Sequence, residues 1–226
     1  MNDTVLITGA SSGIGLATAL LMLSQGCSVQ GLARDFSSTD CPDMEQYICD
    51  LSDLDVLPET LAKISGVPNT LILNAGYGRF GGLEQFSHQQ IRHLMDTNLV
   101  SNLFILKHFL PLMKSNGGGD IVIVGSESAI QGGKAGAVYC ASKFALRGLA
   151  QSLRKDNSEL RTLLINPGPV DSDFFDNLDF APQPGSEFVL APETVAQAIV
   201  NALSLPANTV SEEINIQPLK RSFKKK

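Results

Sequence analysis

The chain has 226 residues, 43% of them hydrophobic, and a formal net charge of −6. This length fits one α/β domain whose core is large enough to fold without a stapling disulfide or metal. The acidic balance argues against a nucleic-acid binder, which is usually basic, and the apolar runs are too short to span a membrane.

The cysteine pattern indicates a reducing compartment. The chain holds 4 cysteines and 3 histidines, without a C-x-x-C pair or the spacing of a metal site. A secretory leader is not expected, because the first residues lead straight into a strand pattern. We therefore expect a cytoplasmic protein that binds no metal and no membrane.

Short apolar runs alternate with segments of helical periodicity along the chain. Strands are predicted at residues 5–8, 29–33, 46–49, 70–73, 121–124, 161–165 and 213–216. Helices are predicted at residues 14–24, 52–64, 87–114, 137–155 and 192–203. The alternation predicts one α/β domain over residues 1–226, a Rossmann-like, doubly wound parallel sheet of about seven strands with helices on both faces.

Two segments lack clear periodicity, and a third segment, at the end of the chain, is basic. Residues 35–45 are rich in serine and contain a proline, so the helix expected there is missing or vestigial. Residues 167–190 are rich in Pro, Gly and Phe and are predicted to be a substrate lid. The basic residues 218–226 are interpreted as a solvated tail, with a binding patch as the alternative.

The first strand runs into the turn TGASSGIG, residues 8–15. Glycines permit a tight turn and a close approach of backbone to ligand, and the next helix offers free N–H groups to a pyrophosphate. A plain strand-to-helix turn is the alternative. Further on, YCASK places Tyr139 and Lys143 one helical turn apart. The lysine charge would lower the pKa of the tyrosine towards a useful proton donor, unless the two are an ordinary surface pair.

Taken together, these motifs resemble the short-chain dehydrogenases/reductases over essentially the whole chain. The resemblance rests on T-G-x-x-x-G-x-G, Asn74-Ala75-Gly76, Tyr139-x-x-x-Lys143 and Pro167-Gly168, which occur in the family's order. It implies an enzyme that moves a hydride between a nicotinamide cofactor and a carbonyl or alcohol substrate, with Tyr139 as the general acid/base. The implied catalytic residues are Asn98, Ser126, Tyr139 and Lys143. Gly125 stands where the family often has a second serine.

The resemblance also implies a set of cofactor contacts. The matching positions are Gly9, Ser11, Ser12, Gly13, Ile14, Gly15, Arg34, Asp50, Leu51, Asn74, Ala75, Gly76, Tyr139, Lys143, Pro167, Gly168, Val170 and Ser172. Asp50 has a second interpretation as a cap for the following helix. Ser172 keeps the hydroxyl of the family's threonine.

Cofactor choice depends on the end of the second strand. Ala33 stands where NAD-preferring members carry an acidic residue, and Arg34 suits a phosphate, so NADP(H) is expected. NAD(H) remains the alternative if Arg34 pairs with Asp35. Ser12 occupies the position where some NADP-specific members carry a second basic residue.

The predicted substrate side is largely apolar. Its candidate residues are Tyr77, Arg79, Phe80, Ser128, Ile130, Phe174 and Phe175. Arg79 would bind an anionic tail or lie on the surface, and the early end of the chain predicts an open pocket. A dinucleotide sensor without turnover and a sugar-nucleotide epimerase or dehydratase are the other functional readings. Family members pair through the helices of Asn98 and Tyr139, so a homodimer or homotetramer is expected.

Overall fold

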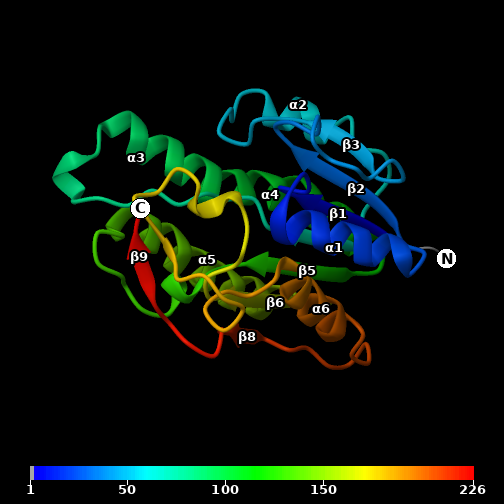
Figure 1. Ribbon diagram of the computed structural model, residues 1–226. Helices are drawn as coiled ribbons and strands as arrows, with labels where there is room; N and C mark the ends of the chain where they lie inside the picture. The colour runs from blue at the N-terminus through cyan, green and yellow to red at the C-terminus, as the bar shows by residue number, and fades with distance from the viewer. Residues whose placement is uncertain (1–2) are drawn as a thin grey trace.

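A parallel sheet organises the protein, for which a computed structural model describes residues 3–226 (Figure 1). Its seven strands lie in the order β3-β2-β1-β4-β5-β6-β8. All neighbouring strands pair in parallel, which confirms the predicted doubly wound sheet. The strands are β1 (Thr4–Thr8), β2 (Ser28–Ala33), β3 (Glu45–Ile48), β4 (Thr70–Leu73), β5 (Gly119–Val124), β6 (Leu160–Pro167) and β8 (Glu213–Ile216).

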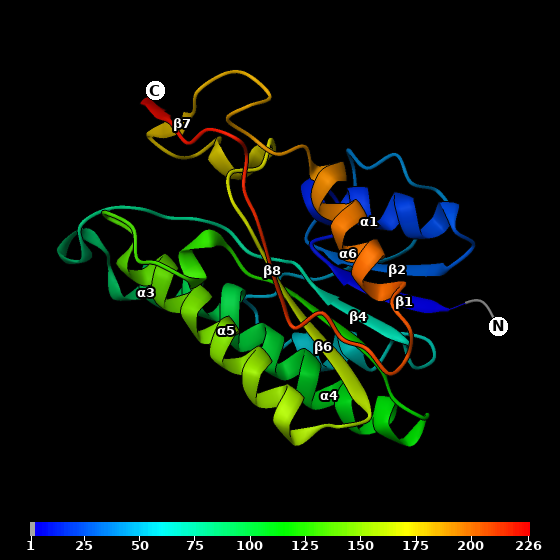
Figure 2. The same cartoon turned by 90° about the horizontal axis from the view of Figure 1, so that it is seen from below.

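Helices cover both faces of the sheet because alternate residues of each strand point to opposite sides (Figure 2). Val5 and Ile7 of β1 belong to one core with α1 (Gly13–Ser24) and α6 (Pro192–Leu203). Leu6 belongs to the other core, on the side of three further helices. These are α2 (Leu57–Leu61), α4 (Ser101–Ser115) and α5 (Ala137–Asp156).

The long helix predicted at residues 87–114 is interrupted. Ser87 caps α3 (His88–Met95) through a reciprocal pair of hydrogen bonds with Gln90, of 3.0 and 3.1 Å. A π-helical segment at Asp96–Val100 then separates α3 from α4. Such wide turns are rare and often mark functional positions. Here the segment contains Asn98, which is fully buried.

The helix predicted at residues 52–64 is observed only as the short helix α2. Asp50 accepts hydrogen bonds from the backbone and hydroxyl of Ser52, at 2.9 and 2.8 Å, and so stabilises a turn ahead of the helix. As expected, the structure has no helix at residues 35–45. Within residues 3–226, no helix combines the length and apolar character needed to cross a membrane.

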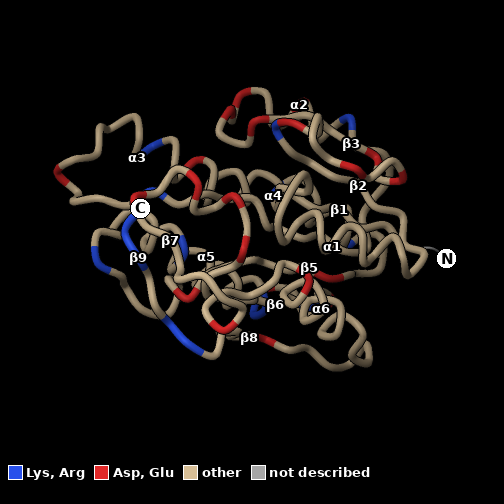
Figure 3. The backbone as a smooth tube through the Cα atoms, viewed as in Figure 1, with Lys and Arg blue, Asp and Glu red and all other residues tan. Residues whose placement is uncertain are grey.

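The basic C-terminal segment is not a free tail. Its strand β9 (Phe223–Lys225) pairs in antiparallel fashion with β7 (Phe180–Pro182) in a second, two-stranded sheet. The β9 lysines remain exposed, but the backbone lies against the predicted lid (Figure 3). The more open pocket expected of a short chain stays a prediction.

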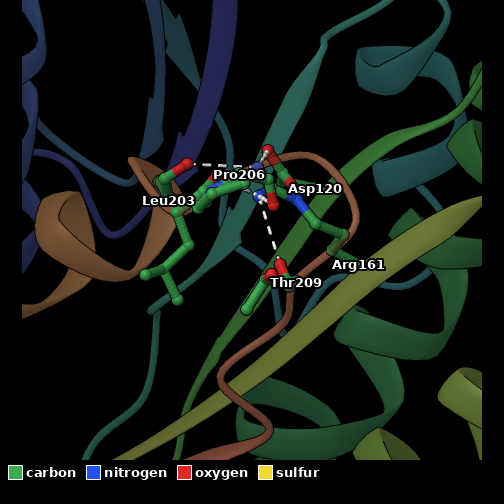
Figure 4. Close-up of polar contacts among 6 residues, drawn as sticks. Asp120, Arg161, Leu203, Pro206 and Thr209 are labelled. Carbon is green, nitrogen blue, oxygen red and sulfur yellow. Dashed lines mark hydrogen bonds and ion pairs between the residues drawn. The ribbon is translucent and has the colours of Figure 1, made fainter.

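Arg161 ties the sheet to the loop after α6, as Figure 4 shows. Its guanidinium binds both carboxylate oxygens of Asp120 across β5 and β6, at 2.6 and 2.7 Å. It also donates to the carbonyls of Leu203, at 3.1 Å, and Leu205, at 2.9 Å. One planar fork of five N–H donors therefore satisfies a carboxylate and several loop carbonyls at once.

Replacing this arginine should destabilise the fold. Arg161→Ala leaves Asp120 without its counter-charge and the loop carbonyls without a donor, which should lower the free energy of unfolding by about 2–3 kcal/mol. Urea denaturation measures the change. Lys114→Ala is the control, because its ion pair with Glu159 is exposed and should contribute less than about 1 kcal/mol. Equal effects of the two variants would contradict this role of Arg161.

Candidate active site

The glycine-rich turn folds as tightly as its sequence allows. Gly9 and Gly13 have positive φ angles of 65° and 53°, which residues with a β-carbon rarely adopt. A β-carbon on Gly15 would lie 2.1 Å from the carbonyl oxygen of Gly9. Ser12 is exposed at the N-cap of α1, and its hydroxyl makes no capping bond to the first helical amides. The turn therefore forms a cradle whose backbone is bare at its three glycines and which lies at a positive helix end, and this fits a pyrophosphate.

Asn74 holds this turn against the end of β4. Its side-chain amide donates to the carbonyls of Thr8, at 3.0 Å, and Gly9, at 3.2 Å. In return, the Thr8 hydroxyl accepts the backbone N–H groups of Asn74 and Ala75, each at 3.0 Å. Both N–H groups of the Asn74 amide are thus committed to the fold. The carboxyl ends of β1 and β4, where the two halves of the sheet diverge, are joined by this network.

Asn98 joins the segment after β4 to α5. Its side chain accepts the N–H of Tyr77 and donates to the carbonyl of the same residue, each at 3.0 Å. It also donates to the hydroxyl of Ser142 at 3.2 Å. A β-carbon on Gly76 would lie 3.2 Å from the Asn98 amide oxygen and 3.5 Å from Nζ of Lys143. Asn98 and Lys143 therefore approach the same glycine from two elements.

The other predicted catalytic residues meet at the carboxyl end of β5. Tyr139 and Lys143 lie on α5, and Lys143 donates to the carbonyl of Val124 at 3.0 Å. Its Nζ lies 5.9 Å from the centre of the Tyr139 ring. Ser126 begins the short 3-10 helix η3 (Glu127–Ala129), where its hydroxyl accepts the N–H of Ser128 at 3.1 Å. Their exposed fractions are 8% for Ser126 and 5% for each of Tyr139 and Lys143.

Burial dominates the protonation of this group. It raises the pKa of Tyr139 to about 12, with a hydrogen bond to Ser126 acting in the opposite direction. It lowers the pKa of Lys143 to about 8. The expectation that Lys143 lowers the pKa of Tyr139 below its ordinary value is therefore wrong for the protein alone. At neutral pH, Tyr139 is a neutral phenol, which can donate a proton, beside a lysine that still carries most of its charge.

The departure from the family pattern at Gly125 has a local cause. A β-carbon there would lie 2.1 Å from the amide oxygen of Asn166, a fully buried residue of β6. Asn166 in turn donates to Glu213, at 3.0 Å, and Asn215, at 2.9 Å, on β8. A serine at residue 125 would collide with this network. Sequence reasoning missed the network, because the residues concerned are about 40 or more positions apart.

Arg34 stands free at the end of β2. It is exposed, and within residues 3–226 it forms no ion pair with a carboxylate. Asp35 instead accepts the N–H and the hydroxyl of Ser37, both at 2.8 Å, and these bonds lower the pKa of Asp35. The pairing of Arg34 with Asp35 is therefore not formed. Leu51, which was expected near the adenine, is buried in the core beneath α2.

The segment after β6 runs beside the glycine-rich turn. A β-carbon on Gly13 would lie 3.3 Å from that of Ser172. Val170 forms a bridge with Leu190, which joins the two ends of the predicted lid. The glycine-rich turn and the end of β6 thus lie at one edge of the sheet. The turn contributes Ser11 and Ile14 to this edge, and the end of β6 contributes Pro167 and Gly168.

Aromatic rings cover Tyr139. Phe80 and Phe174 lie against the Tyr139 ring, with centroid separations of 5.3 and 5.8 Å. Arg79 is exposed and lies over the ring of Phe86, as its surface interpretation predicts. The sequence named both phenylalanines as candidate lining residues, but nothing in it indicated that they pack on Tyr139.

Comparisons with known proteins agree with this geometry. The family described as short chain dehydrogenase matches residues 3–182. The sepiapterin reductase of Chlorobaculum tepidum is 29% identical over 96% of this chain and 97% of its own. The NADPH-dependent pterin aldehyde reductase of Arabidopsis thaliana is 32% identical over 75% of this chain and 76% of its own.

A solved structure has the same fold. It is the alcohol dehydrogenase from the archaeon Thermococcus sibiricus complexed with 5-hydroxy-NADP, with a TM-score of 0.87 and 25% sequence identity. The alignment covers 98% of this chain and 99% of that one. The architecture is therefore shared along nearly the whole length of both proteins.

The buried ammonium group of Lys143 should destabilise the folded protein. Lys143→Met removes a buried ammonium group and should raise the free energy of unfolding by about 1–2 kcal/mol at pH 7, since the unbonded Val124 carbonyl offsets part of the gain. The gain should shrink as pH rises from about 8 towards the ordinary lysine value, because native Lys143 then becomes neutral while the unfolded chain stays charged.

Urea denaturation at pH 7 and pH 10 measures this difference. A loss of stability at pH 7 would mean that the hydrogen bond to Val124 outweighs the cost of burial.

Proposed function

The chain belongs to the short-chain dehydrogenase family, and on that premise we propose that it is an NADP(H)-dependent oxidoreductase that interconverts a carbonyl compound and its alcohol. The observation that carries the proposal is the cluster of Ser126, Tyr139 and Lys143 beside Gly76, next to a glycine-rich cradle. The family assignment supports an oxidoreductase. The finer roles below are our proposals for this chain.

The reaction needs a hydride donor, a proton donor and a way to stabilise charge on oxygen. Bound NADPH would supply the hydride. Tyr139 donates its phenolic proton to the substrate oxygen, and Ser126 donates a hydrogen bond to the same oxygen. Lys143 lies close enough to stabilise the phenolate left behind. Asn98 holds the turn after Gly76 in register with α5, so that the proton donor stays in place.

Protonation favours the reductive direction at neutral pH. A phenol whose pKa is raised to about 12 is present almost entirely in its acid form. Reduction starts from that form, whereas oxidation of an alcohol requires the phenolate. The free protein is therefore protonated as carbonyl reduction requires, and reduction is the direction we propose to test first.

NADP(H) is the better match to the end of β2. Arg34 is exposed and unpaired there, and Asp35 is occupied by Ser37. A free guanidinium can bind a 2′-phosphate through a fork of hydrogen bonds. The names of two similar proteins mention NADP or NADPH. NAD(H) remains the second candidate.

The substrate we propose is a carbonyl compound attached to a flat ring. Phe80 and Phe174 provide aromatic surface next to Tyr139, and aromatic rings favour offset stacking on planar partners. Two similar proteins are named for pterin compounds, which contain a flat ring. An anionic tail is less well supported, because Arg79 packs on Phe86 at the surface.

We also propose that the protein is a homodimer or homotetramer. Large apolar side chains remain exposed on the outer helices, including Leu103 and Leu112 of α4 and Phe144 of α5. Their exposed fractions are 42%, 41% and 43%. Apolar surface on neighbouring helices is typical of a surface that pairs with another copy.

Loss of the phenol should separate an enzyme from a cofactor sensor. Tyr139→Phe should keep NADPH binding, followed by nicotinamide fluorescence, and lower kcat by about 100-fold or more because the proton donor is gone. Tyr47→Phe is the control, since its hydroxyl bonds Glu45 and Ser65 at the far edge of the sheet. Full turnover by Tyr139→Phe would contradict the assigned role.

Loss of the free guanidinium should weaken NADPH selectively. Arg34→Ala should raise the Kd of NADPH about 10- to 100-fold, because a charge-assisted fork to the phosphate is lost, and leave the Kd of NADH nearly unchanged. Arg79→Ala removes one exposed positive charge elsewhere and is the control. Equal or tighter binding of NADH by the native protein would favour the NAD(H)-linked alternative.

A further inference from the structure

We propose that residues 220–226, called the clasp below, fasten the lid of residues 167–190 over Tyr139 and so control substrate access. In this proposal, Arg221 and Phe223 are positioning residues of the substrate site. The access role rests on the proposed function, because it concerns the same tyrosine. The attachment of the clasp to the lid can be tested without any turnover.

The clasp follows the lid along its backbone. In the β7–β9 pair, Phe180 stands opposite Lys225 and Pro182 opposite Phe223. Beyond the pair, the N–H of Gln183 donates to the carbonyl of Ser222 at 2.9 Å. The N–H of Lys226 donates to Asp179 at 2.9 Å, and that of Lys220 to Glu187 at 2.8 Å. The two segments are therefore joined at several points, as neighbouring strands of one small sheet.

Charge complements this pairing (Figure 3). The lid carries acidic residues along its length, namely Asp171, Asp173, Asp176, Asp179 and Glu187. The clasp carries basic ones, namely Lys220, Arg221, Lys224, Lys225 and Lys226. Nζ of Lys220 lies 3.7 Å from Glu187, and the Lys226 ammonium binds the carbonyls of Phe175 and Asp176. Attraction between exposed charges of this kind weakens as salt is added.

Arg221 anchors the clasp outside the lid. It forms an ion pair of 2.8 Å with Glu127, the residue that follows Ser126. The side chain of Glu127 is only 18% exposed, against 62% for Arg221. Burial raises the pKa of Glu127, and the nearby Arg221 charge opposes this effect. The clasp is thus connected to the lid through β9 and to the catalytic end of β5 through Arg221.

Aromatic contacts continue from the clasp to the catalytic residue. The Phe223 ring lies 5.7 Å from Phe180, and Phe180 lies 5.1 Å from Phe80, which contacts Tyr139. A second route passes from Phe223 through Phe175, at 6.4 Å, to Phe174. Phe174 lies on the Tyr139 ring. These rings make a continuous path from the last strand to the proton donor.

This arrangement closes the site around Tyr139, which is 5% exposed. A substrate reaches the phenol only when Phe174 and its part of the lid move away. Binding to a conformation that is fractionally populated is weakened in proportion to that fraction. Contacts that hold the lid shut in the free protein therefore raise KM. The clasp supplies such contacts from a segment remote in sequence from the lid.

Hydrogen–deuterium exchange of lid peptides tests the attachment directly. Arg221→Ala should speed exchange in peptides covering residues 173–190 by about two- to fivefold, and Phe223→Ala by about two- to tenfold. Arg221→Lys should stay near the native rate, because it keeps the charge. Lys114→Ala, which breaks an exposed ion pair on another face, should leave the lid unchanged. Native lid exchange should also rise when salt is increased from 0.05 to about 0.5 M. Unchanged lid exchange in both Arg221→Ala and Phe223→Ala would overturn the proposal.

Steady-state kinetics test the consequence for access. Arg221→Ala should lower KM for the carbonyl substrate by about two- to fivefold and leave the Kd of NADPH unchanged, with Arg221→Lys restoring the native KM. An unchanged or raised KM despite faster lid exchange would overturn the access role. If no carbonyl compound is turned over even by the native protein, the proposed function fails, whereas faster lid exchange in the variants would still establish the clasp.

Discussion

The hydrogen bonds between Asn74, Thr8 and Gly9 are the contact on which the rest of the site depends. They join the carboxyl ends of β1 and β4, the strands between which the chain reverses its direction of winding. The glycine-rich turn leaves β1 at this point, and the turn through Gly76 leaves β4. Because Gly76 then approaches Asn98 and Lys143, the glycine-rich turn and the proposed catalytic residues lie at the same edge of the sheet.

Packing at this edge also keeps an unfavourable charge in place. Lys143 is buried, and burial lowers its pKa, so the folded protein holds an ammonium group at a cost in free energy. The Val124 carbonyl compensates part of that cost, and the sheet and α5 supply the remainder through apolar packing around Leu146 and Ala150. A residue that destabilises the fold but lies next to a proton donor is typical of a functional site.

The sequence predicted the fold class and the position of nearly every strand, because a parallel sheet covered on both faces requires apolar runs at regular intervals. It predicted α6 and β8 to the residue. The helix at residues 52–64 was too long, since Asp50 and Asp53 accept local hydrogen bonds that favour turns. The π-helical segment at Asn98 also left no signal, because its periodicity differs from that of the flanking helices over only a few residues.

Site chemistry was predictable where it depended on residues close in sequence and not where it depended on burial or distant partners. The spacing of Tyr139 and Lys143 predicted their placement on one helix face, but burial raises the pKa of Tyr139. Part of the surface that buries it comes from Phe80 and Phe174, which are distant in sequence. Gly125 departs from the family pattern because the buried Asn166 amide leaves no room there for a side chain, and Asn166 is distant in sequence.

The basic C-terminal segment is the clearest case in which partners distant in sequence determine what a sequence pattern means. Read alone, a run of lysines in an acidic chain suggests a tail in solvent or a patch for an anionic partner. Its nearest acidic partners are in the protein itself, in the lid and at Glu127, from about 30 to nearly 100 positions earlier in the chain. The charge pattern therefore did not predict a binding partner for this segment, because the fold brings together opposite charges that are far apart in sequence. The basic segment instead packs on residues 180–182, and a path of phenylalanine rings connects its strand β9 to Tyr139.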